Sequence, residues 1–60
     1  MKIETYGQDS PVKGLRIVEF AVVSDQVRQW IDENGSLSFR YRVSELESNG
    51  WIKLDERQQN

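Results

Sequence analysis

The chain contains no cysteine and no histidine, and this restricts how its sixty residues can be held together. Without cysteine it can form neither a disulfide nor a thiolate metal site, and the absence of histidine removes the commonest transition-metal ligand. Sixty residues can form only a small apolar core, close to the lower limit that stabilises a folded chain without other support. The sequence therefore predicts a single domain over residues 1–60 that has a dense apolar core or forms a homodimer.

The composition is that of a folded protein. Hydrophobic residues make up 37% of the chain and charged residues 30%, which is too apolar for a disordered segment. The longest apolar run, residues 20–23, is far too short to span a bilayer, and the N-terminus lacks the pattern of a signal peptide. We therefore expect a cytoplasmic protein with no membrane association.

Residues 24–35 carry the signals of a helix. Ser24 is a good N-cap, and Asp25 is placed to complement the helix dipole in the first turn. Three apolar residues follow at helical spacing, Val27, Trp30 and Ile31. The pair Asn34-Gly35 is typical of a helix end. This pattern predicts the main helix at about residues 25–34, with Arg28 pairing along the helix with Asp25 or Asp32.

Several segments are predicted to be strands. Residues 1–6 favour a short edge strand, residues 7–11 a loop, and residues 15–23 a strand with apolar residues on both faces. Glu19 interrupts this second strand, and we expect it to face solvent or to pair with Arg40 or Arg42. Residues 37–43 alternate cleanly, which predicts a strand with one buried face formed by Leu37, Phe39, Tyr41 and Val43.

The C-terminal third leaves two interpretations open. Ser44 and Glu47 fit a capping box and would start a single helical turn, whereas residues 47–50 could instead form a hairpin turn. Residues 51–54 are predicted to form the last strand, and residues 56–60 are expected to fray. The predicted fold is α+β, with a small, mostly antiparallel sheet of three to four strands packed against the helix at residues 25–34.

No residues are arranged for catalysis. The four glycines stand singly, the carboxylates lack the spacing of a calcium loop, and the chain has little room for a cleft that would shift a carboxylate pKa. We therefore expect no enzymatic activity, no metal and no cofactor.

Two kinds of binding site remain. Arg40 and Arg42 alternate with aromatic residues, as in proteins that stack nucleic-acid bases on rings and neutralise phosphates, and Lys13 and Arg16 could extend this basic surface. The net charge of −2 counts against such a role. Large aromatic residues are also the usual anchors of protein interfaces, and the candidates here are Trp51, Trp30 and Tyr41.

The segment that starts Arg42-Val43-Ser44-Glu45-Leu46 and ends at Ile52 resembles the end of the recognition helix in small winged helix-turn-helix proteins of phages and bacteria. Residues 27–37 resemble the first helix and short strand of that family. The resemblance implies a degenerate winged helix, with Arg40, Tyr41, Arg42 and Ser44 near DNA. However, the chain has no room for the family's second helix between Leu37 and Arg40.

Taken together, the residues favour a small non-enzymatic binding or regulatory protein that acts on another protein, of the kind that phages and mobile elements encode. The alternative is a nucleic-acid-binding transcriptional regulator that uses Arg40 and Arg42.

Overall fold

The computed structural model describes residues 1–60 and consists of five strands and one short helix. In chain order the elements are β1 (Lys2–Ser10), β2 (Gly14–Val22), β3 (Val27–Ile31), β4 (Leu37–Arg42), α1 (Val43–Ser48) and β5 (Ile52–Gln58). All pairings are antiparallel, and the strand order is β4-β3-β2-β1-β5. Strands β1 to β4 therefore follow each other as a meander, and β5 returns to pair with β1.

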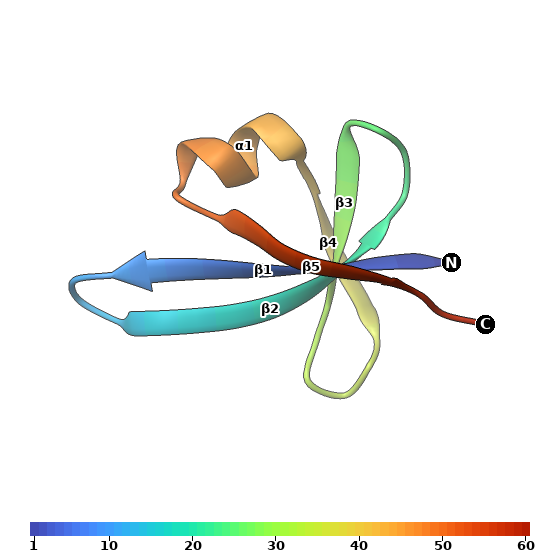
Figure 1. Cartoon of the computed structure of the whole chain (residues 1–60), viewed down its shortest axis with the longest axis horizontal. Helices are drawn as coiled ribbons and strands as arrows, with labels where there is room; N and C mark the ends of the chain where they lie inside the picture. Colours follow the sequence, from blue (N-terminus) through green and yellow to red (C-terminus); the bar gives the residue numbers. More distant parts are fainter.

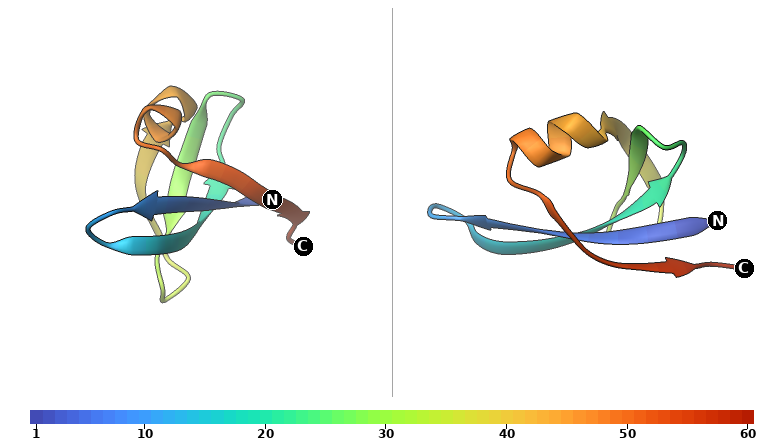
Figure 2. Two further views of the ribbon diagram at one scale, coloured as in Figure 1. Left: turned by 60° about the vertical axis from the view of Figure 1, so that its left-hand side comes forward. Right: turned by 45° about the horizontal axis from the view of Figure 1, so that its top comes forward.

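The sheet is strongly bent. Strand β2 pairs with β1 over most of its length but with β3 only through its last four residues, 19–22. As a result, β3 and β4 run across the direction of β1, β2 and β5 (Figure 1). Helix α1 lies over one side of this bend, which we call the concave face (Figure 2). The two termini are adjacent, because the Met1 amino group donates to the Gln59 carbonyl at 2.9 Å.

The prediction of an α+β fold with a main helix at about residues 25–34 is wrong, as is the degenerate winged helix. Residues 27–31 form β3, and the only helix, α1, has six residues. Val27, Trp30 and Ile31 fit a helical spacing, but β-branched and aromatic residues also favour strands, and pairing on both sides decides in favour of the sheet. Trp30 consequently points to the opposite side of the sheet from Val27 and Ile31.

The residues interpreted as helix caps form turns instead. The Ser24 carbonyl accepts a hydrogen bond from the Val27 amide, which closes the turn between β2 and β3. At the turn between β3 and β4, the Asp32 carboxylate accepts hydrogen bonds from the Asn34 and Ser36 amides at 3.0 and 2.9 Å. Gly35 has a φ of 81°, which its lack of a side chain allows. Ser, Asp, Asn and Gly serve turns and helix ends equally well, so local signals could not separate the two.

The strand predicted from the alternation at residues 37–43 is confirmed over residues 37–42, but its predicted buried face is wrong. Phe39 is 72% exposed and Leu37 is 53% exposed. The register between β3 and β4 shifts after Gln29, so that Trp30 faces two residues of β4. This bulge interrupts the alternation, which leaves Tyr41 on the concave face and Phe39 in solvent.

The C-terminal third contains the helical turn. Helix α1 begins after Arg42, whose amide donates to the Glu45 carboxylate at 3.1 Å, in place of the capping box expected from Ser44 and Glu47. Strand β1 extends through Ser10 and lies between β2 and β5, so it is not an edge strand. Strand β5 includes residues 56–58 of the terminus that was expected to fray.

The core lies on the concave face beneath α1. Phe20, Tyr6 and Leu46 are buried there, and partly buried Val18, Trp30, Tyr41 and Trp51 pack around them. Burial of a side chain such as Phe20 contributes roughly 1.5–3 kcal/mol. Only seven residues of the chain are fully buried, so the fold depends on a few side chains.

Candidate functional site

The concave face holds a pocket of about 240 Å³ between α1 and the sheet. Its base is formed by the buried side chains of Phe20 and Leu46. Its walls are three partly exposed rings, those of Trp30, Tyr41 and Trp51. A cavity of about 150 Å³ can hold benzene, so this aromatic pocket has room for one large apolar side chain.

Each wall comes from a different segment of the chain. Trp30 on β3 lies opposite Phe20 on β2, so both rings project from the same face of the sheet. Tyr41 comes from β4, and Trp51 directly follows Gly50, whose φ of 82° turns the chain from α1 into β5. The centroids of these three rings lie 6.2–6.4 Å from that of Phe20, and Tyr41 and Trp51 meet it edge-on. The edge-on contacts to Phe20 leave ring surface open to the pocket.

Polar side chains form the rim of the aromatic pocket: Gln8, Arg16, Glu45 and Asn49. The Gln8 side-chain amide donates to the backbone carbonyl of Asn49 at 2.7 Å, which ties β1 to the end of α1. The Arg16 guanidinium carbon lies 5.5 Å from the centroid of the Trp51 ring. This contact is a cation–π interaction across the mouth of the pocket.

A buried carboxylate lies beyond the pocket on the same concave face. The Glu4 side chain is only 3% exposed and accepts hydrogen bonds from Arg28 Nε and from the Tyr6 hydroxyl, each at 2.8 Å. Lys53 Nζ lies 3.4 Å from the same carboxylate and Lys2 Nζ lies 3.9 Å from it. Burial alone would raise the pKa of Glu4, but the hydrogen bonds from Arg28 and Tyr6 and the charges of Arg28 and Lys53 outweigh it and lower this pKa. Glu4 is therefore held ionised and joins β1, β3 and β5.

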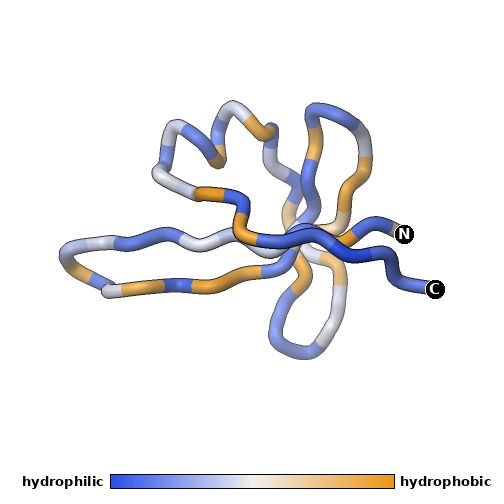
Figure 3. The backbone as a smooth tube through the Cα atoms, viewed as in Figure 1, coloured by the Kyte–Doolittle hydropathy of each residue, from blue (hydrophilic) through white to orange (hydrophobic).

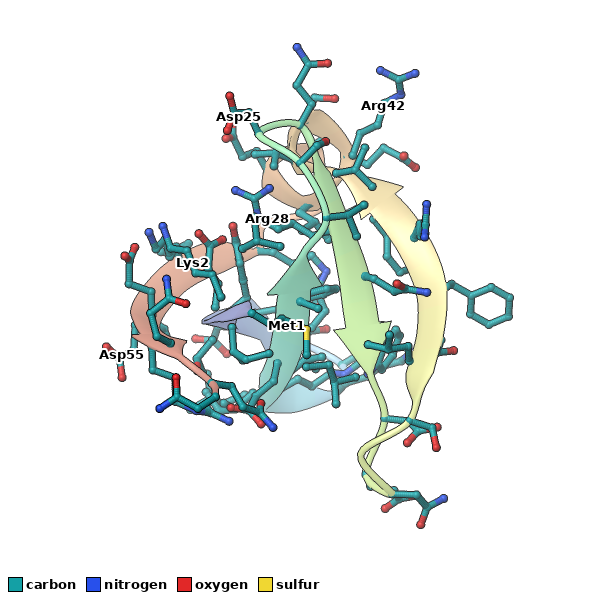
Figure 4. The ribbon with its side chains drawn as sticks, turned by 90° about the vertical axis from the view of Figure 1, so that its right-hand side faces the viewer. Met1, Lys2, Asp25, Arg28, Arg42 and Asp55 are labelled. Carbon is teal, nitrogen blue, oxygen red and sulfur yellow. The ribbon has the colours of Figure 1, made fainter.

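The charged pairs differ from those expected. Arg28 lies on the side of the sheet that faces β5 (Figure 4) and binds Glu4, so it does not pair with Asp25 or Asp32. Glu19 pairs with Arg57 of β5, and not with Arg40 or Arg42. Both differences follow from the strand order, because β5 pairs with β1 and so brings its charges beside residues from the first half of the chain.

The opposite face of the sheet carries a second feature, which we call the outer aliphatic patch. Its members are Leu15, Ile17, Ile52 and Leu54, which are 54–70% exposed. They surround Gly7, which pairs with Ile17 on one side and Ile52 on the other and leaves space for the Leu54 side chain. Figure 3 shows this apolar character on β2 and at the start of β5, in contrast to the hydrophilic remainder of β5.

The residues predicted as binding sites are distributed unequally. Trp30, Tyr41 and Trp51, the three candidates for a protein interface, line one pocket. The four candidates for nucleic-acid contact do not share a surface. Arg16 lies at that pocket and Lys13 in the adjacent turn between β1 and β2, whereas Arg40 and Arg42 lie on the edge strand β4, where Arg42 points outward (Figure 4).

The sequence interpretation missed Leu46, Gln8 and Glu45 as parts of the pocket. Their places depend on how α1 folds back over the sheet, and neither spacing nor composition indicates that. No group of three or more acidic side chains is placed to hold a metal ion.

Comparison with known proteins identifies no relative: no family model matches the chain, and no curated protein or solved structure is significantly similar to it. None of its helices has the length and apolar character needed to cross a membrane.

Proposed function

We propose that the chain is a small non-enzymatic protein-binding domain that anchors one apolar side chain of a partner in the aromatic pocket. The observation that carries this proposal is the shared pocket of Trp30, Tyr41 and Trp51. Few residues form the core, yet these three large rings remain only partly buried. Tryptophan and tyrosine are enriched among the residues that dominate binding energy at protein interfaces, where they lie in pockets that lose water on binding. Cytoplasmic location and origin in a phage or mobile element belong to the same proposal.

The test is selection of binders from a displayed random-peptide library, followed by titration of synthetic peptides while the two-dimensional amide spectrum is recorded. We expect selected peptides to shift the indole signals of Trp30 and Trp51. Tyr41→Ala should weaken binding at least about tenfold, which corresponds to 1.4 kcal/mol. Phe39→Ala is the matched control, because Phe39 lies on the same strand, is exposed and does not line the pocket.

A variant that fills the pocket keeps the test independent of core stability. Gln8 lies on the rim, and Gln8→Trp places a ring over the pocket mouth without removing any core side chain. We expect this variant to fold and to lose peptide binding. Peptides that bind Gln8→Trp and Tyr41→Ala as well as they bind the unchanged chain would show that the pocket is not the binding site.

A second candidate function is binding of single-stranded nucleic acid along β4. It is favoured by the exposure of Phe39 beside Arg40, together with the lack of an ion pair at Arg40 and Arg42. An exposed ring can stack on a base while guanidinium groups neutralise phosphates. Fluorescence anisotropy with DNA and RNA oligonucleotides at low salt tests this candidate. Binding should weaken steeply with added salt and with Phe39→Ala, while Lys13→Gln, at the distant turn between β1 and β2, leaves it unchanged.

A further inference from the structure

Arg16 lies at the aromatic pocket and has no anionic partner, unlike Arg28 and Arg57. Arg28 binds Glu4 and Arg57 binds Glu19, whereas Arg16 makes no ion pair and its guanidinium donates no hydrogen bond within the chain. It comes from β2, directly opposite Gln8 of β1, and so lies on the rim of the aromatic pocket. The contact with Trp51 holds an uncompensated positive charge at the pocket mouth.

The surroundings of Arg16 are more basic than the chain as a whole. Lys13 and Arg16 line a shallow hollow beside the pocket, and Lys13 also lacks an ion pair. Asp9 is the one carboxylate in that hollow, and it pairs with neither cation. On the other side of the pocket, the Glu45 carboxylate accepts a hydrogen bond from the Arg42 backbone amide and so caps the start of α1. In a chain of net charge −2, the hollow beside the pocket therefore offers two unpaired cations against one carboxylate, while Glu45 on the far rim takes part in the start of α1.

We propose that the occupant of the aromatic pocket is an apolar side chain of a partner protein that is flanked by an aspartate or glutamate, whose carboxylate pairs with Arg16. This inference rests on the proposed function and specifies its ligand. A guanidinium can bind a carboxylate through two parallel hydrogen bonds, and stacking on Trp51 limits the orientations that Arg16 loses on binding. A basic partner segment is disfavoured, because its positive charge would lie beside that of Arg16, which already occupies the Trp51 ring at the pocket mouth.

The experiment uses peptides selected on the full chain and compares each acidic peptide with its amide counterpart, in which Asp is replaced by Asn or Glu by Gln. Affinities are measured by calorimetry with the unchanged chain, Arg16→Gln and the matched control Arg40→Gln. We expect Arg16→Gln to weaken the acidic peptide about tenfold and to leave the amide peptide unchanged. Arg40→Gln should affect neither peptide, because Arg40 is exposed on β4 and does not line the pocket. Arg16→Lys, which keeps the charge but not the paired hydrogen bonds, should have an intermediate effect.

The outcomes separate this inference from the proposed function. Selection of basic or uncharged peptides, or an equal effect of Arg16→Gln on both members of a pair, overturns the acidic ligand while the pocket remains the binding site. Failure to select any peptide that Gln8→Trp blocks overturns the proposed function itself, and the inference with it. Preference for oligonucleotides over every peptide would transfer the role of Arg16 to phosphate binding and also refute the proposal.

Discussion

Replacing Arg28 by methionine tests the interpretation that the buried ion pair between Glu4 of β1 and Arg28 of β3 stabilises the fold. The Arg28 side chain is 11% exposed and its partner Glu4 is 3% exposed, so the pair is largely shielded from water. Removal of one member of a buried pair costs about 3–5 kcal/mol, because the remaining charge loses its compensation. In Arg28→Met, Glu4 keeps the Tyr6 hydroxyl at 2.8 Å and Lys53 at 3.4 Å. We therefore expect the lower end of the range, about 3 kcal/mol.

Urea denaturation followed by tryptophan fluorescence measures this loss, and thermal unfolding gives a second readout. In a domain of this size, 1 kcal/mol corresponds to about 4–8 °C, so Tm should fall by roughly 12–24 °C. Arg57→Met is the matched control. Arg57 also pairs with a glutamate on another strand, but the two side chains are 52% and 39% exposed, so its loss should cost less than about 1 kcal/mol.

A double variant separates the uncompensated charge from lost packing. Glu4→Gln removes the charge that Arg28→Met leaves unpaired, and the amide oxygen can still accept the Tyr6 hydroxyl. The double variant should therefore be more stable than Arg28→Met alone. If Arg28→Met costs no more than Arg57→Met, or if Glu4→Gln adds to the loss, the buried charge does not govern stability as argued.

Three further results are expected. Because folding lowers the pKa of Glu4, the ionised carboxylate stabilises the folded chain fully above the ordinary carboxylate pKa of about 4.3, and this stabilisation is lost as pH falls through the lower pKa of the folded state. Urea midpoints measured against pH should show this loss in the unchanged chain and a smaller loss in Glu4→Gln. Gly35→Ala should destabilise the chain by about 1–2 kcal/mol in the same assay, because alanine is strained at a φ of 81° although nothing crowds its methyl group. An equal cost for Asn34→Ala, at the neighbouring exposed position where φ is not positive, would argue against backbone strain as the cause. Homodimerisation would bury the outer aliphatic patch, so sedimentation velocity should show a concentration-dependent dimer that Ile17→Lys dissociates. Val12→Lys, at a 90% exposed position in the turn between β1 and β2, should leave the dimer intact, and a chain that is monomeric at every concentration contradicts this expectation.

Part of the fold follows from local patterns in the sequence. The β-branched run at residues 15–23 and the alternation at residues 37–43 predict strands, and both are strands in the structure. Ser44 and Glu47 indicate a helical turn, with a hairpin turn at residues 47–50 as the alternative, and α1 lies there, although Arg42 and Glu45 form its cap. These elements could be predicted because their periodicity or turn residues act within a few positions.

The candidate site is less accessible to such reasoning. The aromatic residues Trp30, Tyr41 and Trp51 could be singled out as anchors by residue type alone, but nothing in their spacing shows that they share a pocket. Arg16 was expected at a basic surface with Arg40 and Arg42, whereas the bend of the sheet places it over Trp51. Side chains from β1, β2, β3, β4 and α1 meet at the pocket only after β3 and β4 fold across β2 (Figure 1).

What the sequence determines by itself is a small domain without disulfides, made of short apolar segments separated by turns. Only the tertiary structure decides that residues 27–31 are a strand, because its two neighbours supply the hydrogen bonds that a helix would have made internally. It likewise decides which residues of β4 are buried, because the bulge opposite Trp30 shifts the alternation by one residue. The physical reason is common to both. Hydrophobic spacing restricts the choices, but pairing with segments distant in sequence selects among them.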